Sequence, residues 1–358
     1  MLKKLYRLLS NNNKILVYFV IKLMKIFLTI FIFCLVLFIY LHIQFHLKVG
    51  NDLEIYELDN ASKDKLEEIC DIRQPVIFDF ENDKLVQSTN KDAILSNYKA
   101  FDINIRNSND QNYDSEIYVP LQFQTAIKLF TDDTSSSFFS ENNQDFLSET
   151  GLIKHFQYND AFIRPYMVSN CNYDVILGSA GVVTPFRYEL NYRNYFLVTQ
   201  GTIQIKLSPP VSSKYLNMVY DYENFEFRSP MNPWNIQSNY SADFDKIKCL
   251  DVTLSIGQTI QIPAYWWYSI KMEKDTSISC FRYRTYMNNA AICPHIFMYG
   301  LQLQNIKRDS VKKHDITALN KKVKTNEEEK KEKKENNENM VSTVEEEHTT
   351  SISDLPSS

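Results

Sequence analysis

Arg187 and Glu189 are the side chains whose type and spacing say most about the chemistry of this sequence. They stand two residues apart in a predicted strand, so both point to the same face of the sheet. A guanidinium and a carboxylate on one buried face form an ion pair that neutralises itself. Alternatively, Arg187 binds an anionic small molecule or the carboxylate of a partner protein, aided by Tyr268 and Thr184. The residues alone leave both interpretations open.

Two stretches of the chain position these residues, and both predict strands joined by glycine turns. The first runs from Ile176 to Glu189 and continues to a turn at Gly201. The second runs from Leu250 to Ile270, alternates around a turn at Gly257, and contains the adjacent Trp266 and Trp267, which should face opposite sides of the sheet. Four of the seven glycines in the chain fall in these two stretches, so the segment from 175 to 286 is predicted to be rich in strands and turns.

These stretches resemble the cupin-like branch of the JmjC family, which includes the asparaginyl hydroxylase that inhibits hypoxia-inducible factor. The first family motif reads Gly-x-x-x-x-Thr-Pro-x-His-x-Asp, and the second reads Pro-Gly-Asp-x-x-x-x-Pro-x-x-Trp-Trp-His. Gly257, Pro263, Trp266 and Trp267 match the second motif in register. The resemblance covers about residues 60 to 288. It implies a mainly β fold with flanking helices, a double-stranded β-helix of the cupin or jelly-roll type, and, in active members, hydroxylation that depends on Fe(II) and 2-oxoglutarate.

The resemblance also locates the positions that would hold iron, and these have changed. The first histidine position is Arg187, the carboxylate position is Glu189, and the distal histidine position is Tyr268. Such a site needs two imidazoles and one carboxylate, whereas a guanidinium stays protonated and has no lone pair to donate. The lysine that pairs with the cosubstrate falls near Ile203. We therefore expect no metal and no cofactor.

Other residues of the family pattern remain and are candidates for lining a pocket at this place. They are Thr184, Asn194 and Trp267. Of the histidines in the predicted folded region, neither His155 nor His295 is expected to rescue a metal site.

These observations support two hypotheses about function. The first is a membrane-anchored, cupin-like protein that acts as a non-catalytic binding or scaffold module, with a protein or an anionic small molecule as its ligand. The alternative is a divergent protein hydroxylase that uses Fe(II) and 2-oxoglutarate. The resemblance also admits a homodimer. The net charge of −5 gives no reason to expect nucleic acid as a partner.

Residues 26–47 form an uncharged, strongly apolar stretch of 22 residues. A helix of this length spans the roughly 30 Å hydrocarbon layer, so we predict a transmembrane helix rather than a signal peptide or a buried helix. Residues 1–25 carry only basic charges, which by the positive-inside rule places them in the cytosol and the following domain in a lumen or outside the cell. The glycosylation sequons at Asn60 and Asn239 would be usable only on that side.

The rest of the chain divides by composition. Residues 55–300 are expected to form the cupin-like domain, and the charged segment 306–358 a disordered tail. Within the domain we expect a capped helix over 59–70, a strand over 73–80, turns around short strands over 81–118, and helices over 118–130 and 144–156. Outside the apolar stretch, five cysteines form either one or two disulfides or free thiols.

Overall fold

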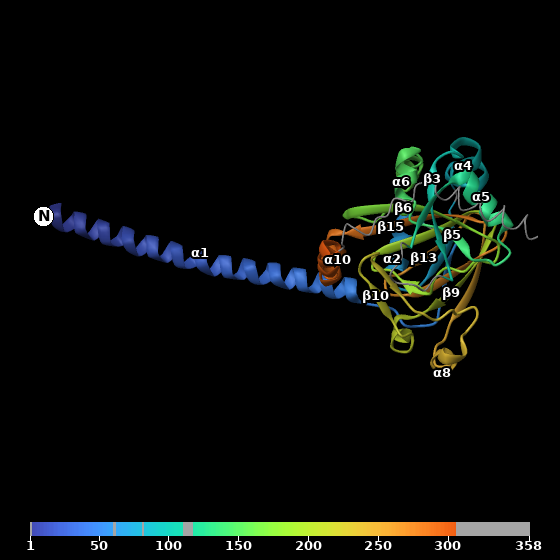
Figure 1. The fold of residues 1–358 in the computed structure, drawn as a ribbon. Helices are drawn as coiled ribbons and strands as arrows, with labels where there is room; N and C mark the ends of the chain where they lie inside the picture. The colour runs from blue at the N-terminus through green and yellow to red at the C-terminus, as the bar shows by residue number, and fades with distance from the viewer. Residues whose placement is uncertain (1, 60–61, 81, 110–116, 306–358) are drawn as a thin grey trace, which may run out of the picture. The chain divides into compact units, whose positions relative to one another are not determined.

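The computed structural model describes residues 2–59, 62–80, 82–109 and 117–305. Among these residues the strands form two sheets, with helices packed around them (Figure 1). The first sheet has nine strands in the order β1 (Tyr56–Leu58), β2 (Val76–Asp79), β13 (Gln258–Ile262), β8 (Arg193–Gln200), β15 (Ser277–Thr285), β6 (Val168–Gly178), β5 (Phe138–Ser140), β3 (Asp102–Asn107) and β4 (Val119–Gln122). The second has six strands in the order β10 (Val219–Asp221), β11 (Glu226–Arg228), β7 (Arg187–Tyr188), β14 (Trp267–Met272), β9 (Thr202–Ser208) and β12 (Leu250–Ser255). The predicted mainly β fold with flanking helices is confirmed.

Alternation along the strands builds the core between the two sheets. On β14, Tyr268, Ile270 and Met272 share one face and are fully buried in a cluster with Phe196 of β8. Because strand side chains alternate, Ser269 and Lys271 between these positions point to the opposite face of the sheet. Fully burying one such aliphatic side chain contributes about 1.5–3 kcal/mol, so this interior fixes the register of the sheets.

The outer face of the nine-stranded sheet is covered by helices. Phe281 and Tyr283 of β15 point to this side and pack in one cluster with residues of the helices. The helices are α2 (Lys63–Cys70), α3 (Asp83–Thr89), α4 (Lys91–Tyr98), α5 (Phe123–Asp132), α6 (Gln144–Glu149) and α7 (Ile153–Asn159). The expected helix before Cys70 and the following strand are present.

Two of these helices correct the expectation of turns over 81–118. Asn82 caps α3 by accepting from the backbone N–H of Leu85, and Asn90 caps α4 by accepting from the backbone N–H of Ala93. Asparagine favours turns and helix N-caps for the same reason, since its short side chain bonds nearby backbone groups. The asparagines that suggested turns are therefore helix starts.

Trp266 and Trp267 point to opposite sides of the six-stranded sheet, as expected. The Trp266 indole donates to the carbonyl of Arg73 at 3.1 Å, whereas the Trp267 indole donates to Ser213 Oγ at 2.8 Å on the other side of the six-stranded sheet. Trp267 belongs to a third apolar cluster with Phe186 and Phe227. Around this side lie η1 (Pro210–Tyr215), η2 (Ser238–Tyr240), α8 (Ser241–Phe244), α9 (Tyr286–Ala291) and α10 (Cys293–Asn305). The predicted turns at Gly201 and Gly257 have φ of 74° and 86°, a conformation that favours glycine.

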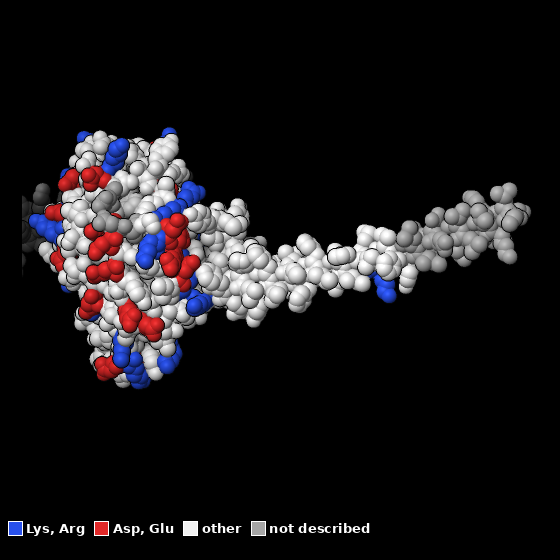
Figure 2. Space-filling model, turned by 180° about the vertical axis from the view of Figure 1, so that it is seen from behind, with Lys and Arg blue, Asp and Glu red and all other residues white. Residues whose placement is uncertain are grey.

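The chain begins with one long helix, α1 (Leu2–Leu47). Its segment Tyr18–Leu47 is long and apolar enough to be a membrane span or a signal sequence, and none of its most apolar stretch is buried. Figure 2 shows this part as almost wholly uncharged surface. At its end, His46 Nε2 lies 3.1 Å from Thr285 Oγ1. All six cysteines lie in the described part of the chain and are free thiols. The Asn60 sequon and the segment 306–358 fall outside the described residues.

Candidate functional site

The three positions of the altered ligand pattern do converge in space. Strand β7 pairs with β14 so that Arg187 stands directly opposite Tyr268 in the antiparallel ladder. The Tyr268 hydroxyl donates to Glu189 Oε1 at 2.6 Å. The backbone thus brings residues 187, 189 and 268 to one end of the barrel interior.

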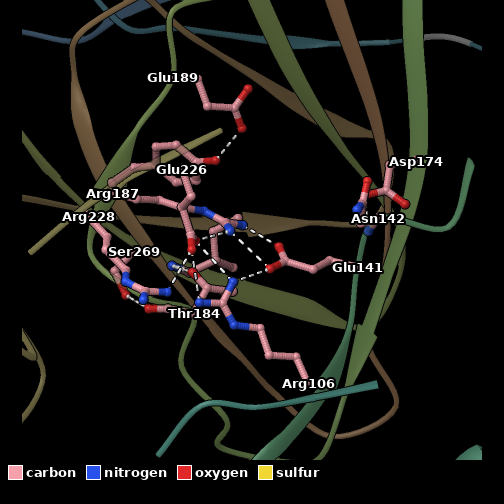
Figure 3. A network of polar contacts seen from close by, with 12 residues as sticks. Arg106, Glu141, Asn142, Asp174, Thr184, Arg187, Glu189, Glu226, Arg228 and Ser269 are labelled. Carbon is pink, nitrogen blue, oxygen red and sulfur yellow. Dashed lines mark hydrogen bonds and ion pairs between the residues drawn. The ribbon is translucent and has the colours of Figure 1, made fainter. Parts of the chain in front are cut away.

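Arg187 is held by two carboxylates, Glu141 just after β5 and Glu226 on β11 (Figure 3). Its Nη1 donates to Glu141 Oε1 at 3.0 Å and to Glu226 Oε1 at 2.9 Å, while its Nη2 bonds Glu141 Oε2. Arg106 donates to the same two carboxylates, at 2.9 Å to Glu141 and at 3.0 Å to both oxygens of Glu226. Arg228 adds a further bond to Glu226 at 2.9 Å. The result is a buried network of alternating charge.

Glu189 belongs to a second set of contacts. Arg282 Nε donates to both of its oxygens at 3.0 Å, and Asn191 donates to Oε2 at 2.7 Å. Arg282 also reaches Asp174 Oδ2 at 3.4 Å. The expectation that Arg187 and Glu189 neutralise each other is therefore corrected. Each has a nearer partner, because Glu141 after β5, Glu226 on β11 and Arg282 on β15 enter the same space.

The electrostatics of the network favour fixed charges. Burial alone would raise the pKa of Glu141, but Arg187 and Arg106 outweigh it and hold that pKa at about 2. Burial likewise opposes ionisation of Glu189, yet the charge of Arg282 and the hydroxyl of Tyr268 keep its pKa below the usual value. The pKa of Tyr268 is raised by burial and by the charge of Glu189, so its phenol stays protonated.

Arg187 and Glu189 line a cavity of about 580 Å³ at this end of the barrel. Its walls also include Glu141, Glu226, Arg282 and Arg284. Within the described chain Arg284 has no carboxylate within bonding distance. Its Nε donates to Asn191 Oδ1 at 2.6 Å, and its guanidinium lies 4.9 Å from the ring centroid of Phe225. A polar cavity of this size is adequate for a small ligand or a protruding side chain.

The three remaining candidates lie behind this cavity or beside it. Thr184 lines a smaller cavity of about 140 Å³, and its Oγ1 accepts from the backbone N–H of Ile270 at 2.9 Å. Asn194 is buried and donates to the carbonyl of Ile262 at 3.2 Å. Neither Asn194 nor Trp267 is among the residues that line these two cavities: Asn194 bonds the backbone of the barrel, and Trp267 is buried in the third cluster.

Four residues of the site were not predicted from the sequence: Arg106, Glu141, Glu226 and Arg282. Three of them come from short strands or strand ends outside the two motifs, where nothing in the sequence marks a shared location. Arg282 had a signal, because Phe281-Arg-Tyr-Arg284 alternates aromatic and basic residues. In a strand with one face under helices, that alternation places both arginines on the opposite face.

The donor set was tested against the iron and 2-oxoglutarate of active relatives, and it does not fit. Arg187 carries no lone pair, Tyr268 keeps its proton, and both oxygens of Glu189 are bound by Arg282. Among the described residues no group of three histidines, cysteines or acids could hold a metal ion. Ile203, at the lysine position, is fully buried among apolar side chains and has no charge to offer a cosubstrate.

The histidines do not supply replacement donors here. His295 Nδ1 lies 3.1 Å from the Tyr222 hydroxyl, and His155 lies on α7, on the outer side of the nine-stranded sheet.

Comparison with known proteins finds one family whose model matches most of the chain. A family model described as a cupin-like domain matches residues 46–286. A search of curated proteins found no match.

Proposed function

The chain belongs to the cupin-like domain family, and from that premise we propose that it is a membrane-anchored, non-catalytic binding or scaffold module. The observation that carries the proposal is the position of Arg187, where a guanidinium bonded by Glu141 and Glu226 takes the place of the first metal-binding imidazole. A fixed cation at this point repels a divalent ion. The two carboxylates keep it there.

The energetics support a lasting change rather than a side chain that swings aside. Arg187 and Glu141 are both buried, with 8% and 3% of their side chains exposed. Breaking a buried pair by removing one partner costs about 3–5 kcal/mol, because it leaves an uncompensated charge in a poorly solvated place. A metal ion would have to displace Arg187 against that cost.

The cavity supports a binding role. Arg187 and Arg282 are already paired with carboxylates of the chain itself, so their charges are neutralised and they are poor anchors for a new anion. Arg284 faces the same cavity without a carboxylate partner in the described residues, and Asn191 and Phe225 fix its orientation. We propose Arg284 as the anchor for an anionic small molecule or for an acidic side chain of a partner protein.

Catalysis is tested on the full chain, purified in detergent. Metal analysis after loading with Fe(II), followed by an assay for 2-oxoglutarate turnover, should show neither stoichiometric iron nor turnover above a buffer control. The matched variant is Glu189→Ala. Turnover in the native chain that Glu189→Ala abolishes would establish the divergent hydroxylase instead.

Anchoring and orientation are tested separately, by expression in a glycosylating membrane system. The chain should stay in the pellet after alkaline extraction, because α1 is too apolar to leave the bilayer. Asn239 is exposed on η2, so a lumenal domain should carry a glycan that Asn239→Gln removes. Release by alkali would contradict the anchor, and absence of the glycan would contradict the lumenal orientation.

A further inference from the structure

Helix α10 has one face that is already used. His295, Ile296 and Tyr299 turn toward the barrel, where Ile296 joins the third apolar cluster. The Tyr299 ring lies 5.4 Å from that of Phe225, and His295 contacts Tyr222. These spacings of one, three and four residues define one side of a helix, so this side fixes how α10 is rotated against the domain.

The opposite face is apolar and exposed. Pro294, Phe297, Met298 and Leu301 follow the i, i+3, i+4, i+7 spacing of a single stripe. The last three are 64%, 45% and 40% exposed. Residues 293–305 contain no Lys, Arg, Asp or Glu. A surface helix of a soluble domain normally exposes charged residues to water, whereas α10 has no charged residue to expose.

This stripe is close along the chain to the end of the apolar helix α1. Thr285 bonds His46 of α1, and α9, which starts at the next residue, contacts α1. Only Ile292 separates α9 from α10. Tyr286, the first residue of α9, is 60% exposed. Exposed apolar and tyrosine side chains therefore continue from α1 onto the domain surface.

We propose that Tyr286, Phe297, Met298 and Leu301 form a membrane-facing collar that inserts into the lipid interface beside α1. The inference rests on the proposed membrane anchor. Tyrosine is favoured at the boundary between lipid and water, and an apolar helix face is stabilised there by leaving water. The bilayer fits better than a protein partner because α9, which leads directly into α10, packs against the end of the exposed apolar helix α1. The collar would hold the barrel at a fixed orientation against the membrane.

The test uses the full chain in phosphatidylcholine–phosphatidylglycerol liposomes, with one spin label at Met298→Cys. The background carries Cys34→Ser, Cys171→Ser, Cys249→Ser and Cys293→Ser, which leave only the buried thiols of Cys70 and Cys280. The control label is at Ile256→Cys, which is 57% exposed beside Gly257. Gly257 bonds Val198 near the end of β8, and Tyr283 pairs with Arg193 at its start, so Ile256 lies at the far end of the strands from α9.

The label at Met298 should collide often with dissolved oxygen and rarely with a water-soluble nickel chelate, whereas the label at Ile256 should show the reverse. If the chain floats with liposomes but both labels are equally open to nickel, the collar is wrong and the anchor stands. If the chain does not float, both proposals fail. A spectrum at Met298 that broadens with labelled protein and sharpens on dilution with unlabelled chain would assign the stripe to a second copy and overturn the collar.

Discussion

Arg187 and Glu141 meet in a two-point ion pair across the end of the barrel, although 46 residues separate them in the sequence. Arg187 comes from β7 in the six-stranded sheet, and Glu141 directly follows β5 in the nine-stranded sheet. The pair therefore ties the two sheets together at the place where related enzymes would bind metal. Arg187 therefore bears on the stability of the domain as well as on its chemistry.

The substitution Glu141→Gln should destabilise the domain by about 3–5 kcal/mol. It removes the charge that faces both Arg187 and Arg106, leaving two guanidinium groups with only Glu226 between them. Thermal unfolding of the full chain in detergent, followed by circular dichroism, measures the effect. The control is Asp251→Asn, whose exposed pair with Lys206 should contribute little. Equal midpoints for the two variants would mean that the network adds no net stability.

Acid should weaken the domain between about pH 4.5 and pH 2. The pKa of Glu141 is lowered from 4.5 to about 2 by Arg187 and Arg106 against the effect of burial. A carboxyl with a depressed pKa in the folded state contributes stability above its unfolded pKa, and that contribution is lost as pH falls through the folded value. Unfolding midpoints across this window should fall less in Glu141→Gln than in the native chain. Parallel curves would show that Glu141 titrates as in the unfolded chain.

The architecture of the barrel could be predicted because the two motifs contain the glycines that form the turns and the tryptophans that pack between the layers. Gly201 and Gly257 adopt positive φ, and the paired tryptophans occupy opposite layers. Positions 187, 189 and 268 also converge as predicted. Their partners could not be predicted, since Glu141 and Glu226 lie on short elements whose placement depends on pairing between distant strands. Local patterns carry no information about such pairing.

Helices α3 and α4 show a second limit of prediction from the sequence. Their asparagines were interpreted as turn residues, and the structure uses them as caps. Asn90→Ala should therefore cost about 1 kcal/mol, because the backbone N–H of Ala93 loses its acceptor. The control within the same helix is Asn97→Ala, which should be neutral or slightly stabilising, since alanine is the better helix former. The thermal unfolding midpoints of the two variants measure the difference. An equal loss of stability in both would argue against a capping role of Asn90.

The backbone geometry predicts that a metal site of the type used by active relatives can be built here. In Arg187→His with Tyr268→His, two imidazoles would stand opposite each other in the ladder, beside Glu189. Two histidines and one carboxylate on one face suit a divalent transition ion. We expect this double variant to gain Co(II) binding, seen as a visible absorption band that the native chain lacks. Adding Arg282→Gln should strengthen binding, because it removes the guanidinium that binds both oxygens of Glu189 and leaves Oε1 available to a metal ion. The single variant Arg187→His is the control and should bind more weakly than either. A folded triple variant without the band would show that the geometry itself, and not only the side chains, has departed from a metal site.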